Sequence, residues 1–211
     1  GDRGPAAVVA GLAISAHGDA ALDSILPGDE AVLAPLLAQH AELAARITLR
    51  PAARVVTMQD KPSQVMRHGE GTSMWSCIDS VRNNEADVAV SCGNTGALMA
   101  VAMIRLRKIA GVNRPAIACL WPSHNPGGFN VMLDVGADIR AEAEDLLQYA
   151  TMGAAYARNG LDLKRPRVGL LNVGTEEHKG RAELKVAHDR MMVAQDAAGF
   201  EFVGFVEGGD I

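Results

Sequence analysis

The chain has 211 residues, of which 48% are hydrophobic and 21% are charged, so it can form a sizeable core and does not resemble a disordered chain. Its formal net charge of −5 gives it no general attraction for phosphate backbones, which argues against non-specific nucleic-acid binding. The best apolar run, residues 97–104, falls far short of the roughly 18 residues that a membrane span needs. We therefore expect a soluble globular protein with no nucleic-acid partner.

Three cysteines without a CxxC spacing indicate a reducing compartment, with neither a disulfide framework nor a metal site built from cysteine alone. No cluster of histidine, cysteine and carboxylate has the spacing of a zinc site, so no metal is predicted. Residues 1–5 show no signal-peptide pattern and resemble a loop that enters a helix. Residues 207–211 have a composition typical of a turn. We expect both ends to be cut ends of a longer chain.

The first 83 residues favour short helices with little sheet. Pro5 suits the first turn of a helix, Pro35 weakens a second helix, and Thr72 or Ser73 can cap a third. In chain order we predict helices over 6–15 and 30–39, a strand at 47–49, an exposed loop or short helix over 60–71, and a helix from 72 or 73 to about 83.

From residue 87 onward, short β-branched runs alternate with long helical patterns. The predicted strands are 87–91, 116–120, 129–133, 168–171 and 202–203, and the predicted helices run from 93–96 to about 108, from 141 to about 158 and from 181 to 197. Such alternation is typical of right-handed βαβ units around a mostly parallel sheet. The expected fold class is three-layer α/β/α.

Glycine-bearing loops directly follow three of these strands, at residues 91–96, 133–136 and 171–175. In an open parallel sheet, ligands bind beyond the carboxyl ends of the strands. If the three strands are parallel, the three loops open on one edge of the sheet, where we expect a pocket.

The loop at 91–96 is the most informative of the three. Gly93 and Gly96 let the backbone approach a ligand closely, and Asn94 or Thr95 can cap the following helix. The free N–H groups at a helix start, together with the positive end of the helix dipole, suit an anion such as phosphate. A plain strand-to-helix turn explains the same glycines, and the sequence leaves both interpretations open.

Residues in and near these loops admit more than one role. Lys179 can place a cation beside a bound anion, with His178 as a neighbouring acid or base, or both can belong to a solvated loop. Residues 174–180 are not a Walker motif, because no Gly-Lys-Ser/Thr follows. Asp134 can orient a base, help to bind a metal or hold a turn. Cys92 invites a thiol-nucleophile hypothesis, but a small buried residue at a strand end is the simpler interpretation.

Several motifs occur in a fixed order along nearly the whole chain. The main ones are SCGNTGALM at 91–99, NRPA at 113–116, LDVGA at 133–137 and RVGLLNVG at 167–174, with shorter matches at 60–62, 72–74, 148–153 and 206–208. Residues 1–5 look like the tail of an Asp-Ala-Met-Gly-Gly-Asp signature. Together these motifs resemble the bacterial phosphate acyltransferase family PlsX, and the set is far more specific than any one of them.

The resemblance implies an enzyme of phospholipid synthesis that moves a long-chain acyl group from acyl carrier protein to inorganic phosphate, with no cofactor. The implied fold is similar to isopropylmalate dehydrogenases and phosphotransacetylases. The family acts as a homodimer in the cytoplasm, peripherally at the inner face of the membrane, and hands acyl phosphate to a membrane glycerol-3-phosphate acyltransferase. Residues 1–211 would form a single α/β phosphate acyltransferase domain that lacks the family's first strand and its C-terminal third.

Read with the resemblance, the loop at 91–96 becomes a phosphate site. Phosphate would sit on the amides of Thr95 and Gly96, after the turn at Gly93, with Asn94 as a side-chain donor. Held in this way, phosphate would attack the thioester directly, and the reaction would need mainly proximity and orientation.

The other candidate residues come from the two later loops. Lys179 matches the lysine before glycine in a family loop and would neutralise charge on phosphate or on the thioester oxyanion. Asp134 and Asn172 would align the reactants. The remaining candidate binding residues are Gly136, Gly174 and Thr175.

Two departures from the family pattern matter for the mechanism. Cys92 stands where relatives commonly carry alanine, which disfavours an acyl-cysteine route. Residues 68–70 read His-Gly-Glu where relatives often have further basic residues, which weakens any role of that stretch in binding the acidic carrier protein.

Two other functions compete with acyl transfer. A dehydrogenase of the isopropylmalate type shares the fold class, although no set of metal-binding carboxylates for a hydroxy acid is evident. A non-catalytic scaffold would bind acyl carrier protein without consuming phosphate.

Overall fold

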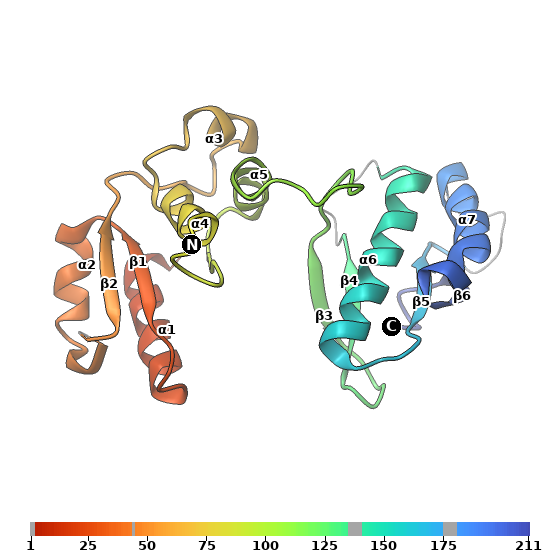
Figure 1. Ribbon diagram of the computed structural model, residues 1–211, viewed down its shortest axis with the longest axis horizontal. Helices are drawn as coiled ribbons and strands as arrows, with labels where there is room; N and C mark the ends of the chain where they lie inside the picture. The colour runs from red at the N-terminus through yellow and green to blue at the C-terminus, as the bar shows by residue number, and fades with distance from the viewer. Residues whose placement is uncertain (1–2, 44, 135–140, 175–180) are drawn as a thin grey trace. The chain divides into compact units, whose positions relative to one another are not determined.

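The computed structural model describes residues 3–43, 45–134, 141–174 and 181–211 (Figure 1). The chain divides into two compact units, Gly1–Ile109 and Ala110–Ile211, each with its own strands and hydrophobic core. Among the helices described, none is both long and apolar enough to cross a membrane.

The N-terminal unit combines a parallel strand pair with helices. In chain order it contains α1 (Gly4–Gly18), β1 (Ser24–Gly28), α2 (Glu30–Leu37), the 3₁₀ turn η1 (Ala41–Leu43), β2 (Ile47–Pro51), α3 (Pro62–His68), α4 (Ser73–Arg82) and α5 (Thr95–Arg105). β1 and β2 are parallel, with Ser24 opposite Ile47. Val9, Leu26 and Leu33 form a buried cluster that joins α1, β1 and α2.

A second core in this unit joins α3, α4 and α5. Its buried members are Val65, Met74, Ile78, Ala97 and Val101. At the edge of this core, Arg105 Nε donates to Asp79 Oδ1 at 2.6 Å, and the guanidinium lies 5.2 Å from the ring centroid of Trp75. The packing fixes the start of α5 against α3, and this contact positions the candidate site.

The C-terminal unit holds two more strand pairs. Its elements are β3 (Ala118–Pro122), β4 (Phe129–Leu133), α6 (Ala143–Leu161), β5 (Arg167–Leu171), α7 (Ala182–Ala198) and β6 (Glu201–Val206). β3 and β4 are antiparallel, whereas β5 and β6 are parallel with a register shift between Val168 and Gly169. The buried core of α6, β5, α7 and β6 includes Leu170, Met191 and Phe200.

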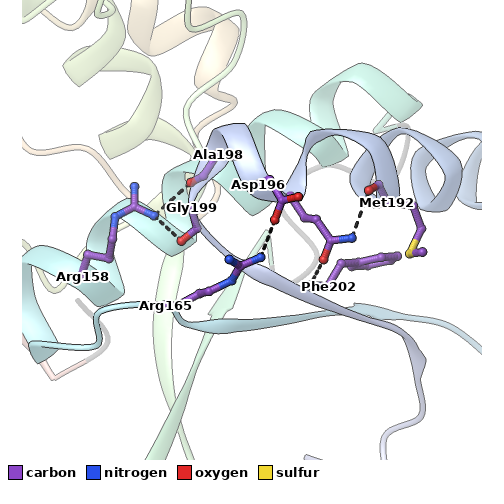
Figure 2. Close-up of polar contacts among 8 residues, drawn as sticks. Arg158, Arg165, Met192, Asp196, Ala198, Gly199 and Phe202 are labelled. Carbon is purple, nitrogen blue, oxygen red and sulfur yellow. Dashed lines mark hydrogen bonds and ion pairs between the residues drawn. The ribbon is translucent and has the colours of Figure 1, made fainter.

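Figure 2 shows how the end of α7 is held. Gly199 follows the helix with φ 71°, in the left-handed region where glycine is favoured. Arg158 of α6 donates through Nη1 to the carbonyls of Ala198 at 3.0 Å and Gly199 at 2.9 Å, and so satisfies acceptors that the helix leaves over. Arg165 Nη2 donates to Asp196 Oδ1 at 2.6 Å on the same end of the helix.

Helices with strong local signals lie close to where the sequence places them. α6 begins with a capping box between Glu142 and Asp145, and α4 is capped by Thr72, whose hydroxyl accepts from Trp75 N. α6 and α7 span 143–161 and 182–198, near the predicted 141–158 and 181–197. The predicted α/β class is confirmed, with two of the three described strand pairs parallel.

The prediction of a strand at 87–91 is wrong. This segment is described as irregular, and Val88 and Val90 are 69% and 77% exposed. A β-branched run becomes a strand only where a neighbouring segment completes its hydrogen-bond ladder. Conversely, β1 was not predicted, because Pro27 and Gly28 are residue types that strands disfavour.

Candidate functional site

Two backbone N–H groups at the start of α5 have no hydrogen-bond acceptor among the described residues. Asn94 is the N-cap, with its Oδ1 accepting from Ala97 N at 3.0 Å, and Leu98 N donates to Asn94 O at 2.9 Å. In the described structure, the amides of Thr95 and Gly96 have no acceptor, and Thr95 is exposed. These are the N–H groups that a helix leaves over at its first turn, where its dipole favours an anion.

The other end of the Asn94 side chain holds a neighbouring loop. Its Nδ2 donates to the carbonyls of Thr57 at 3.2 Å, Met58 at 3.4 Å and Asp60 at 2.8 Å, and the residue is only 9% exposed. Both polar atoms of the side chain therefore bond the protein's own backbone. Donation from Asn94 to phosphate stays a prediction, and it would require Nδ2 to give up one of these carbonyls.

The loop at 57–62 closes against α5 on a second side. Thr57 N donates to Asp60 Oδ2 at 2.7 Å, which folds the loop on itself. A Cβ on Gly96 would lie 3.0 Å from Pro62 Cγ, so the missing side chain at Gly96 lets the start of α3 approach α5 closely. Gly96 was predicted to let a ligand approach the backbone closely. In the structure it is Pro62 of the chain itself that approaches Gly96, and the approach of a ligand stays a prediction.

The cysteines near this loop differ in environment. Cys92 is exposed, so the prediction that it is a small buried residue is wrong; the irregular 87–91 segment before it has no sheet to cover it. Cys77 of α4 is partly buried, and its Sγ donates to Val90 O at 3.8 Å. Burial raises the pKa of the Cys77 thiol above its ordinary value of 9.0, with the Val90 contact opposing this effect.

We expect a thiol-directed alkylating reagent to modify Cys92 well before Cys77. Since the thiolate is the reacting form, a raised pKa lowers the reactive fraction of Cys77 at neutral pH, and its rate should keep rising with pH beyond the ordinary value of 9.0. Mass spectrometry of peptides after timed alkylation measures both rates, with Cys92→Ser as the control. Equal rates for the two residues at neutral pH would contradict the burial of Cys77.

In the C-terminal unit, the loop after β4 begins at Asp134. Its backbone has φ 60°, in the left-handed region that aspartate tolerates better than most residues, and its N–H donates to Ile117 O at 2.8 Å. The residue is half-buried. Gly136, the other candidate of this loop, lies outside the described residues.

The loop after β5 begins at Asn172. Asn172 N donates to Val206 O at 2.9 Å, which continues the pairing of β5 with β6. Its side chain is buried, and Nδ2 donates to Gly174 O at 3.0 Å, so Asn172 shapes the loop in which Gly174 is also buried. Thr175 and Lys179 lie outside the described residues.

The structure brings together only part of the predicted site. Residues 93–96 belong to the N-terminal unit, whereas Asp134, Asn172 and Gly174 belong to the C-terminal unit. Assembly of the three loops into one pocket therefore stays a prediction. Within the described ranges, no group of three or more His, Cys, Asp and Glu side chains is placed to hold a metal ion.

A family model described as a fatty acid synthesis protein matches residues 1–211. The chain belongs to this family.

Relatives within the fatty acid synthesis protein family carry a more specific name. Phosphate acyltransferases of Cereibacter sphaeroides, Paracoccus denitrificans and Dinoroseobacter shibae are 74%, 68% and 66% identical to this chain over 211 residues. Each match covers 100% of this chain, and the chain spans 57%, 57% and 55% of the length of these three relatives.

Among solved structures, EutD phosphotransacetylase from Staphylococcus aureus is similar to this chain. The TM-score is 0.50 at 12% sequence identity, and the match covers 88% of this chain and 69% of the other. At such low identity the likeness shows the fold alone. It confirms the phosphotransacetylase-like fold expected for this family member.

The sequence did not predict that the loop at 57–62 belongs to the candidate site at the start of α5. It contacts Asn94 and Gly96 across more than thirty residues of chain, as the separations of 34 to 37 residues for the Asn94 bonds show. The one available signal was the short Asp60-Lys61-Pro62 match in the set of family motifs.

Proposed function

We propose that the protein carrying this chain transfers a fatty acyl group from acyl carrier protein to inorganic phosphate for phospholipid synthesis. A phosphate oxygen attacks the thioester carbonyl carbon, a C–O bond forms, the C–S bond breaks, and the carrier thiolate leaves and takes up a proton. Membership of the fatty acid synthesis family and the name of the relatives support this reaction. The structural observation that carries it is the pair of N–H groups at the start of α5.

The start of α5 supplies what a phosphate anion needs. The amides of Thr95 and Gly96 donate to phosphate oxygens, and the helix dipole adds a favourable potential. Asn94 acts here chiefly by fixing the geometry, because its side chain bonds Ala97 N and the loop at 57–60. Phosphate held in this way loses little freedom at the moment of attack.

The later loops supply the groups that act on the thioester. Lys179 neutralises negative charge on phosphate or on the oxyanion that forms as the C–O bond is made. Asp134 and Asn172 align the reactants at the ends of β4 and β5. The backbone of Gly136, Gly174 and Thr175 completes the binding surface for phosphate and the acyl donor.

The remaining proposals concern assembly and place in the cell. Residues 1–211 are part of one phosphate acyltransferase domain, which works as a homodimer in the cytoplasm and associates peripherally with the inner face of the membrane. Acyl phosphate then passes to a membrane glycerol-3-phosphate acyltransferase. These steps rest on the family resemblance of the motifs at 91–99, 133–137 and 167–174.

Incubation of the full-length protein with palmitoyl-acyl carrier protein and radiolabelled inorganic phosphate tests the reaction. We expect label in acyl phosphate, and we expect Lys179→Ala to lower kcat/KM by roughly 100- to 1000-fold, the usual cost of removing an oxyanion-stabilising group. Lys185→Ala is the matched control, since Lys185 is an exposed lysine of α7.

Two outcomes would overturn the proposal. Binding of acyl carrier protein without label in any product would favour the scaffold function. An NAD-dependent change in absorbance with a hydroxy acid would favour the dehydrogenase.

A further inference from the structure

We propose that Lys61 supplies the ammonium group that pairs with phosphate at the start of α5. This inference rests on the proposed function, because it adds a binding residue to the same phosphate site. It assigns a role to the Asp60-Lys61-Pro62 motif, which the reaction as proposed above does not use.

The residue before Lys61 is tied to the cap of α5. Asp60 O accepts from Asn94 Nδ2 at 2.8 Å, the shortest of the three hydrogen bonds that this amide donates. The carboxylate of Asp60 is directed elsewhere, since its Oδ2 accepts from Thr57 N at 2.7 Å. The backbone of Asp60 therefore faces α5 while its side chain closes its own loop.

The residue after Lys61 packs on the first turn of α5. Pro62 Cγ lies 3.0 Å from the position a Cβ would take on Gly96. Behind this contact, Val65 of α3 and Ala97 of α5 share one buried core, at 5% and 0% exposure. The approach of α3 to α5 is thus fixed by packing and does not depend on a single pair of atoms.

These two contacts bring the backbone of Lys61 close to the first turn of α5. Its neighbours on either side touch Asn94 and Gly96, and consecutive Cα atoms are only about 3.8 Å apart. Lys61 has extended backbone dihedrals (φ −73°, ψ 131°) and is exposed, as Thr95 is. Its flexible four-carbon stem can bring Nζ to an anion held on the amides of Thr95 and Gly96.

The electrostatics favour this role. Across the described part of the chain, no carboxylate lies within ion-pair distance of Lys61, so its charge is not neutralised by a fixed partner. Backbone amides and a helix dipole provide only partial charges, whereas inorganic phosphate carries a full negative charge or more. A lysine beside the amides adds a full positive charge to these partial charges.

The test compares Lys61→Met and Lys61→Arg with Arg67→Met in the full-length protein. Arg67 is exposed in the last turn of α3, the helix that follows Lys61, so its loss makes the same change in charge at the far end of that helix. We expect Lys61→Met to raise KM for phosphate roughly 10- to 100-fold, with KM for acyl-acyl carrier protein unchanged. Lys61→Arg should recover most of the loss, and Arg67→Met should leave KM for phosphate unchanged.

Binding of inorganic phosphate, measured by equilibrium dialysis with radiolabelled phosphate, makes the inference independent of turnover. A wild-type protein that binds phosphate in a Lys61-dependent manner but forms no acyl phosphate would defeat the proposed function and leave this site standing. Phosphate binding and KM that are unchanged in Lys61→Met, or reduced equally in Arg67→Met, would overturn the inference. Thermal unfolding followed by circular dichroism shows whether Lys61→Met is folded. If it is not, phosphate binding by Lys61→Arg, which keeps the positive charge, decides whether the inference stands.

Discussion

Replacement of Phe200 by alanine is expected to lower the free energy of unfolding by about 3–5 kcal/mol, the usual cost of emptying a large aromatic site in a core. Phe200 is 0% exposed and belongs to the buried cluster with Leu170 and Met191, which joins β5, α7 and β6. Removal of the ring takes away its transfer free energy and leaves a cavity among these side chains.

The surrounding backbone has little freedom to close that cavity. Phe200 N donates to Gln195 O at 3.0 Å, and the preceding Gly199 is held by Arg158. Chemical denaturation followed by far-UV circular dichroism measures the loss, with Val193→Ala as the control, because Val193 is 86% exposed and should change stability by less than about 0.5 kcal/mol. A loss for Phe200→Ala no larger than that of the control would show that the C-terminal core is not closed around this ring.

The fold was predictable from the sequence where a local signal decides it. Thr72 caps α4 through its own hydroxyl, and Glu142 with Asp145 forms a capping box at α6, so residues within one helical turn mark both boundaries. The apolar periodicity of α6 then extends the helix without reference to the rest of the chain. Such information is present in any short window of the sequence.

Strands were less predictable, since a strand depends on a partner far away in the chain. Residues 87–91 have the composition of a strand, yet Val88 and Val90 are exposed and the segment is irregular. Residues 24–28 have a poor composition that includes Pro27, yet they pair with β2 through five residues in register. Pairing and burial outweighed intrinsic preference in both cases.

In the candidate site, too, local contacts were predictable from the sequence and long-range contacts were not. Asn94 or Thr95 was expected to cap α5, and Asn94 does, because the cap bond runs to a residue three positions along the chain. Its three bonds to the loop at 57–60 span 34 to 37 residues and left no trace in the local pattern. The sequence did not predict that the Asn94 side chain also binds the loop at 57–60, and therefore did not predict that Lys61 lies near the start of α5.

Replacement of Asn94 by aspartate is expected to lower the free energy of unfolding by about 3 kcal/mol at neutral pH. One oxygen of the introduced carboxylate keeps the bond from Ala97 N–H, so the cap survives. The other oxygen takes the place of Nδ2 and faces the carbonyl oxygens of Thr57, Met58 and Asp60. Three hydrogen bonds are then lost, and a buried negative charge is repelled by the three carbonyl oxygens that accepted them.

This loss should depend on pH in a defined direction. Burial and the facing carbonyls raise the pKa of the introduced carboxyl above its ordinary value of about 3.9, because only the protonated form can donate to them. The folded variant then binds a proton more tightly than the unfolded one, so its stability falls as pH rises through this range and the deficit is smallest in acid. Asn94→Ser keeps a cap acceptor without the charge, and its deficit should not vary with pH. A deficit for Asn94→Asp that is equally flat would contradict the burial of this site.

The same two variants separate positioning from direct donation to phosphate. If Asn94 holds the loop at 57–60 against α5, KM for phosphate and the loss of stability rise together, since the amides of Thr95 and Gly96 and the approach of Lys61 all depend on that contact. If Asn94 only donates to phosphate, KM rises while stability is kept. Because Nδ2 already has three carbonyl oxygens within 3.4 Å, we expect the first pattern. The second would show that the amide turns from the loop to the substrate when phosphate binds.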